Sequence, residues 1–111
     1  MATATPFPDV IPDEDTETTT RRQPPYAVII HNDDLNSMAF VIEVLIKVFG
    51  YTVPKCYELM MLAHRTGRSV VWVGALEVAE LKADQIRSCG PDPDAKPRGA
   101  QPLGVSVEPT A

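Results

Sequence analysis

Four polar side chains, His31, Asn32, Asp33 and Asp34, follow one another directly after an apolar run of β-branched residues. Carboxylate and amide oxygens accept hydrogen bonds, and a neutral imidazole can accept one more. The same residue types are typical of tight turns, because short polar side chains bond their own backbone. The segment therefore predicts either a turn with a helix cap or a small site for a hydrogen-bond donor.

A second group of side chains falls on one stripe of an expected helix. Met60, Ala63 and His64 have i, i+3, i+4 spacing, which places them on one helical face. Met38 and Val41 have the same relation on the preceding helix. If the two stripes meet beside the polar turn, they form a pocket with an apolar floor and a rim of acceptors. Such a pocket suits a free α-amino terminus followed by a bulky hydrophobic side chain.

The elements that must position these residues can be assigned from residue type and periodicity. Ser37 and Thr52 are expected helix caps, and Gly50 and Gly67 are expected helix ends. In 102–109, Leu103, Val105 and Val107 alternate as in a half-buried strand. The expected order is β-α-α-β-α-β, with a strand at 26–30, helices at 37–49 and 52–66, a strand at 68–74, a helix at 75–90 and a strand within 102–109.

Prolines mark the limits of the folded part. Of the eleven prolines, five fall in residues 1–25 and five in 91–111, and only Pro54 lies between them. Residues 1–24 are also acidic and poor in aliphatic side chains, a composition that cannot bury enough surface to fold. We therefore expect a disordered extension at 1–24 and one core domain at 25–108, interrupted by a proline-rich loop at 91–101.

Charge and composition exclude several classes of function. The net charge is −5 and no basic patch is present, so we expect no nucleic-acid partner. No run of about 18 apolar residues could span a membrane, and no signal peptide precedes the core. Cys56 and Cys89 do not make a disulfide framework. We expect a cytoplasmic monomer with free thiols and no cofactor.

The motifs, taken in order, resemble those of the ClpS family, the adaptors that deliver N-degron substrates to the Clp ATPase–protease. The resemblance depends on "HNDD" at 31–34, Met38, Phe40 and Val41, "ELMMLAH" at 58–64, Gly67 and "EVAELK" at 77–82. It implies an α+β fold in which three helices pack on a small three-stranded antiparallel sheet.

The resemblance also implies site residues and partners. Asn32, Asp34 and His64 would hold the substrate's α-amino group, with Asp33 alongside. The expected hydrophobic pocket consists of Met38, Val41, Met60, Ala63 and Leu103, and Met38 would gate it. Glu77 and Lys82 would dock on the N-terminal domain of a Clp AAA+ ATPase.

Several features depart from the family pattern. Asn36-Ser37 replaces the usual Thr-Pro, and Asn36 could contact the peptide backbone. Ala63 stands where valine is common, which should enlarge the pocket and favour Trp or Phe over Leu. The loop before the last strand is longer and rich in proline.

The expected site and the family resemblance together predict a non-enzymatic adaptor for proteins that begin with Phe, Leu, Trp or Tyr. The alternative is a domain of the same fold that docks on the ATPase as a regulator or inhibitor without selecting substrates. A metal site built from His31, Asp33, Asp34 and His64 is a third hypothesis, although strand alternation points His31 away from Asn32. A Cys56–His64 nucleophilic pair is excluded because eight residues of helix span about 12 Å.

Overall fold

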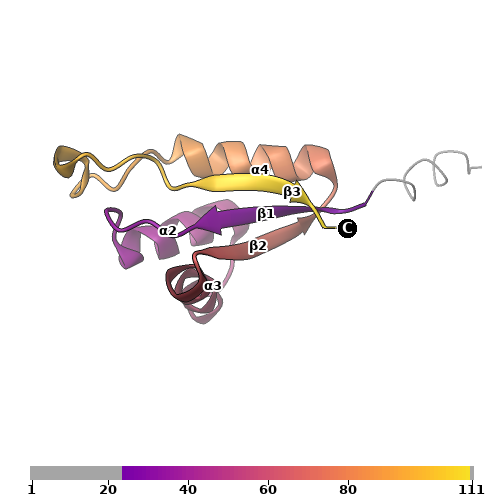
Figure 1. Ribbon diagram of the computed structural model, residues 1–111, viewed down its shortest axis with the longest axis horizontal. Coiled ribbons are helices and arrows are strands. Elements are labelled where there is room, and N and C mark those ends of the chain that lie inside the picture. Colours follow the sequence, from indigo (N-terminus) through magenta and orange to yellow (C-terminus); the bar gives the residue numbers. More distant parts are fainter. Residues whose placement is uncertain (1–23, 111) are drawn as a thin grey trace, which may run out of the picture.

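A three-stranded antiparallel sheet and three helices make up the computed structural model, which describes residues 24–110 (Figure 1). The strands lie in the order β2-β1-β3, so the first strand is central. This arrangement confirms the expected α+β fold and the element order. The elements are β1 (Tyr26–His31), α2 (Met38–Phe49), α3 (Val53–Thr66), β2 (Arg68–Gly74), α4 (Leu76–Ser88), a 3₁₀ turn (Lys96–Arg98) and β3 (Val105–Pro109).

The helix caps are the ones that the sequence predicts. The Ser37 hydroxyl accepts from the Phe40 backbone N–H at 3.1 Å and caps α2. Thr52 caps α3 in the same way. Gly67, which ends α3, has a φ of 97°, a left-handed conformation that glycine adopts without a Cβ penalty. Both helices therefore begin and end at positions set by local chemistry.

The ends of two elements differ from the sequence prediction. α4 ends at Ser88 rather than at residue 90. Cys89 is the cap residue at this end, and the chain leaves the helix at Gly90, which has a φ of 71°. β3 begins at Val105, so Leu103 precedes the strand that was expected to contain it. Leu103 is nevertheless only 2% exposed, and it packs into the core from the preceding loop.

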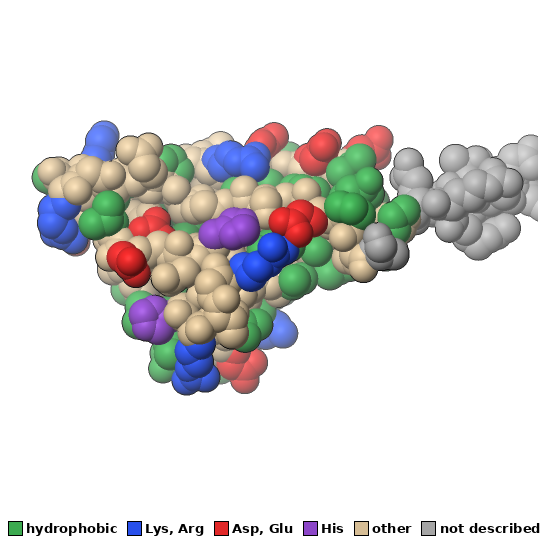
Figure 2. Space-filling model, in the orientation of Figure 1, with side chains coloured by type: hydrophobic (Ala, Val, Ile, Leu, Met, Phe, Trp, Pro, Cys, Tyr) green, Lys and Arg blue, Asp and Glu red, His purple; other side chains and the backbone are tan. Residues whose placement is uncertain are grey.

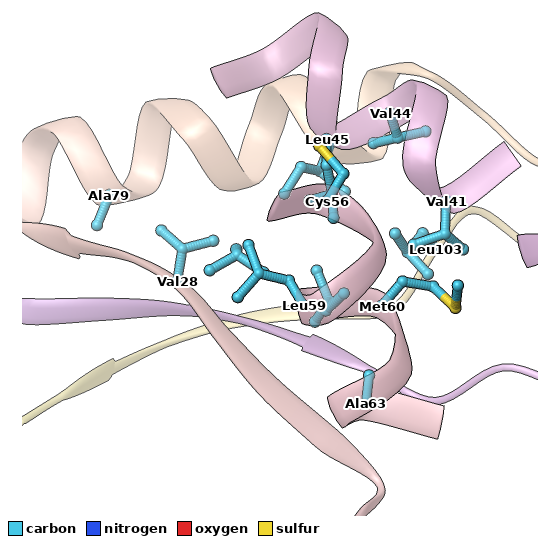
Figure 3. Close-up of a cluster of buried hydrophobic side chains, with 13 residues drawn as sticks. Val28, Val41, Val44, Leu45, Cys56, Leu59, Met60, Ala63, Ala79 and Leu103 are labelled. Carbon is cyan, nitrogen blue, oxygen red and sulfur yellow. The ribbon is translucent and has the colours of Figure 1, made fainter. Parts of the chain in front are cut away.

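All three helices contribute to one hydrophobic core on one face of the sheet. Val28 and Ile30 point into it from β1, and Leu45, Cys56 and Ile86 are fully buried opposite them. Figure 3 shows Val41, Met60 and Leu103 close together at one end of this cluster, with Ala63 nearby. The predicted apolar stripes of α2 and α3 therefore meet at one end of the core.

Several sequence predictions concern features outside this architecture. The predicted extension lies, apart from Pro24, outside the described residues. Within residues 24–110, no helix is long and apolar enough to cross a bilayer. Cys56 and Cys89 are both free, and burial raises the pKa of the Cys56 thiol. Cys56 therefore contributes to packing rather than to nucleophilic chemistry.

Candidate functional site

Two backbone hydrogen bonds fix the polar turn that follows β1. The Asn32 N–H donates to the Gly67 carbonyl at 2.9 Å, which ties the turn to the end of α3. The His31 N–H donates to the Gly104 carbonyl at 3.0 Å, which ties it to the segment before β3. His64 lies in the last turn of α3 and Leu103 precedes Gly104, so both are brought close to Asn32.

A small cavity of about 30 Å³ lies where these segments meet. Its wall includes all five residues of the predicted hydrophobic pocket and three of the four predicted α-amino ligands. Part of this wall is visible in Figure 3. The lining residues are Ile30, His31, Asn32, Asp33, Asn36, Met38, Val41, Met60, Ala63, His64 and Leu103. The structure thus gathers the predicted pocket and amino-group residues except Asp34, which follows Asp33 in the turn but does not line the cavity, and the role of each residue in binding stays a prediction.

The two aspartates of the turn differ in what they bond. Asp33 Oδ1 accepts from the backbone N–H groups of Leu35 and Asn36 at 2.7 and 3.1 Å, and Asp33 Oδ2 accepts from the Asn36 side chain. Asp34 is exposed and receives only a long contact from Asn32 Nδ2, at 3.5 Å. Asp33 is therefore committed to building the turn, whereas the Asp34 carboxylate is available to a ligand.

Met38 is the most exposed part of the apolar wall. It is the first residue of α2 and is 46% exposed, whereas Val41, Met60 and Leu103 are buried. The cavity holds about one water molecule and is smaller than a phenyl ring. A large side chain does not fit into a cavity of this volume, and Met38, with its long flexible side chain, is the exposed residue of the wall that can most readily change its conformation.

Asn36 is buried, and its amide is used inside the protein. Its Nδ2 donates to the Gln101 carbonyl at 2.8 Å as well as to Asp33. Its Oδ1 accepts from the Asp92 N–H at 2.8 Å. These bonds leave little of the amide for the predicted peptide contact, which remains untested. Sequence reasoning missed Asp92 and Gln101, because their proline-rich surroundings carry the signal of a linker.

His31 has a different partner from the other residues of the "HNDD" segment. Its Nε2 lies 2.8 Å from the Ser106 hydroxyl, which in turn contacts Glu108, and Glu108 pairs with Arg68 at 2.6 Å. Figure 2 looks onto this open face of the sheet, where a histidine lies beside an acidic and a basic side chain. Among residues 24–110, no three His, Cys, Asp or Glu side chains are placed to hold a metal ion.

The two predicted docking residues lie on α4. Glu77 is exposed in the first turn of this helix. Lys82 Nζ donates to the Val48 carbonyl at 3.0 Å and lies 5.6 Å from the centre of the Phe49 ring. Leu81, next to Lys82, is 54% exposed, so the helix presents an apolar side chain between charged ones.

Comparison with known proteins identifies the class to which this fold and site belong. A family model described as the ATP-dependent Clp protease adaptor protein ClpS matches residues 21–103. The chain belongs to this family of adaptors. The family model and the relatives named below are described as adaptors of the Clp protease, so the family works with the Clp protease system.

Particular relatives cover most of the chain. The adapter protein ClpS of Nostoc sp. is 38% identical over 91 residues, which make up 81% of this chain and 91% of the relative. The ClpS of Roseobacter denitrificans is 39% identical over 84% of this chain and 77% of the relative. A solved structure of Agrobacterium tumefaciens ClpS2 bound to L-phenylalaninamide matches with a TM-score of 0.68 and 36% identity, covering 79% of this chain and 99% of that one.

Proposed function

We propose that this adaptor captures proteins whose first residue is Phe, Leu, Trp or Tyr and delivers them to a Clp AAA+ ATPase. One observation carries the proposal: hydrogen-bond acceptors and an apolar wall converge on one cavity mouth. The ligand of the similar Agrobacterium structure, L-phenylalaninamide, has a free amino group beside a phenyl ring and thus fits the same chemistry.

The polar rim suits a charged α-amino group. An ammonium offers three N–H donors, and Asn32, Asp34 and His64 offer an amide oxygen, a carboxylate and an imidazole nitrogen. Hydrogen bonds to charged groups contribute about 1.5–3 kcal/mol each. Asp33 supports this set indirectly, because its three hydrogen bonds hold the turn that presents Asn32 and Asp34.

The apolar wall suits the side chain of the first residue. Val41, Met60 and Ala63 are buried neighbours on facing helices, and Leu103 closes the wall from the loop. Burying a large hydrophobic side chain contributes about 1.5–3 kcal/mol. A charged or small first residue gains none of this, so the wall supplies the discrimination among N-termini.

Docking on the ATPase is proposed for the exposed face of α4, through Glu77, Leu81 and Lys82. Leu81 contributes an apolar contact and Glu77 a charge at the rim. Lys82 also supports the end of α2, so its substitution would disturb the fold. The variants Glu77→Arg and Leu81→Asp are better tests. We expect both to weaken binding to the isolated N-terminal domain of the ATPase while peptide binding stays unchanged.

The proposal is tested by fluorescence anisotropy with labelled peptides that differ only in the first residue. We expect the chain to bind peptides that start with Phe, Leu, Trp or Tyr and to reject those that start with Gly or Glu. The matched control is the same peptide with the bulky residue moved to the second position. Equal affinity for all of these peptides would contradict the proposal.

The alternative, a regulator that docks on the ATPase without selecting substrates, is favoured by one observation. The cavity of about 30 Å³ is smaller than any of the proposed side chains. This alternative predicts normal binding to the ATPase domain and no discrimination among peptides. The peptide series therefore separates the two functions.

A further inference from the structure

The loop between α4 and β3 lies against the start of α2. It extends past the end of α4 at the end of the molecule where the β1–α2 turn is found (Figure 1). Residues 91–101 of this loop have little regular structure besides the 3₁₀ turn. Hydrogen bonds from Asn36 and Ser37 hold it in place, and these are the residues that replace the family's usual Thr-Pro.

Two side chains make this contact, and we call them the clasp: Asn36 and Asp92. The Asn36 amide accepts from the Asp92 N–H and donates to the Gln101 carbonyl, each at 2.8 Å. Asp92 Oδ2 accepts from the Ser37 backbone N–H at 3.2 Å. Both side chains are buried, with 6% and 7% exposed. Three hydrogen bonds thus join the loop to the two residues that immediately precede α2.

The charge of Asp92 is well placed for this contact. α2 has no acidic residue in its own first turn, and Asp92 supplies a carboxylate there from a distant part of the chain. Hydrogen bonds from the Asp94 N–H and from Ser37 hold the pKa of the Asp92 carboxyl below its usual value. Asp92 is therefore ionised at neutral pH and accepts strongly from the helix start.

Both ends of the clasp continue directly into the cavity wall. Ser37 is followed by Met38, the exposed first residue of α2. Gln101 precedes Leu103 by two residues, and Gly104 on the other side is bonded to His31. Leu103 therefore lies between two anchored residues. Gly104 is held by its hydrogen bond to β1, and Gln101 is held by the clasp. If the clasp is lost, both Met38 and Leu103 lose a restraint.

We propose that the clasp positions Met38 and Leu103 against the first side chain of the substrate, and that Asp92 is thereby a specificity-determining positioning residue. This inference rests on the proposed function, because it concerns the same cavity. Asp92 does not line the cavity. Asp92 therefore affects which side chains the apolar wall accepts, and it does not affect recognition of the amino group.

The test compares Asp92→Ala with Asp94→Ala. The second variant removes the same charge from the same loop, and Asp94 contributes only its backbone N–H to Asp92. Affinities are measured for peptides starting with Phe, Leu and Val, each with a free or an acetylated amino group. We expect Asp92→Ala to change the Phe-to-Val preference by about tenfold, the scale on which one methylene alters discrimination in an apolar pocket. Asp94→Ala should bind as the unchanged chain does.

A graded variant keeps the proposal open to refutation if Asp92→Ala folds poorly. Asp92→Asn retains one acceptor oxygen, so its preference should fall between those of the unchanged chain and Asp92→Ala. The acetylated peptides should show no measurable binding in any of the variants, because the clasp does not alter recognition of the amino group. If the unchanged chain selects Phe and both Asp92 variants keep the same preference, the clasp proposal is wrong while the proposed function stands. If the unchanged chain does not select at all, both are overturned.

Discussion

The turn at the cavity mouth contains two neighbouring aspartates for which the structure implies opposite roles. Asp33 accepts three hydrogen bonds from Leu35 and Asn36, whereas the exposed Asp34 has only a long contact with Asn32. Replacement of each by alanine removes the same charge from adjacent positions. The two variants therefore form a matched pair in which stability and ligand binding should separate.

Asp34→Ala should affect binding alone. An exposed surface substitution changes the free energy of unfolding by about 0.5 kcal/mol or less. A lost charge-assisted hydrogen bond to the ammonium costs about 1.5 kcal/mol at such an exposed site, the lower end of the usual range, which corresponds to roughly a tenfold weaker Kd. All peptides with a free bulky N-terminus should weaken together if the Asp34 carboxylate binds the amino group that they share.

Asp33→Ala should affect stability first. It removes the acceptor of the backbone N–H groups of Leu35 and Asn36 and one of the two acceptors of the Asn36 amide, and each hydrogen bond contributes about 0.5–1.5 kcal/mol net. Urea unfolding can be followed through Trp72, the single tryptophan, which packs against the core. Peptide affinity is measured by anisotropy without urea, where both variants are folded.

The reasoning would be refuted by an Asp34→Ala variant that binds peptides normally, or by an Asp33→Ala variant that is as stable as the unchanged chain.

Three further predictions follow from the same geometry. If His64 accepts from the ammonium, a His64→Gln variant, which keeps an acceptor, should bind Phe-started peptides more tightly than a His64→Ala variant in anisotropy titrations; equal affinities of the two variants would contradict this. The hydrogen bond from Arg68 lowers the pKa of the Glu108 carboxyl, so the stability that Glu108 contributes is present above its ordinary pKa and is lost as the pH falls through the lowered value. Glu108→Gln should therefore flatten the decline in urea midpoint below about pH 4.3, and an unchanged acid profile would contradict this. Ala63→Val adds two methyl groups to the wall of the cavity, so it should weaken binding of a Trp-started peptide about tenfold more than that of a Leu-started one.

Local chemistry made most of the fold predictable. The cap residues Ser37 and Thr52 and the helix ends at Gly50 and Gly67 determine α2 and α3 without reference to the rest of the chain. The prediction that the three strands form one antiparallel sheet came from the family resemblance rather than from periodicity, and their order within the sheet was not predicted. A short three-stranded sheet buried on one face has too little pattern to reveal which strand is central.

Helical spacing also made most of the cavity wall predictable. Met60, Ala63 and His64 share a stripe by periodicity alone, and the structure places all three at the cavity. Sequence alone could not separate the roles of Asp33 and Asp34, because both are turn residues of the same type. Only the three-dimensional turn shows which carboxylate bonds to the backbone and which one remains open.

The contribution of the proline-rich loop could not be predicted. Asp92 bonds to residues 55 and 56 positions away, and no local pattern marks such a pairing. Leu103 was expected to belong to a strand, yet it reaches the core from the loop that Asn36 holds. Long-range hydrogen bonds of this kind follow from the packed fold, so they lie beyond residue-type and spacing arguments.

The most direct test of the account uses one peptide in two forms. A peptide that starts with Phe is measured by anisotropy with a free α-amino group and again with that group acetylated, which removes its charge and all but one of its N–H donors while the phenyl ring stays the same. If the acceptors beside the cavity bind a free N-terminal amino group, the acetylated form should show no measurable binding at concentrations that saturate the free form. Equal affinities for the two forms would contradict the account.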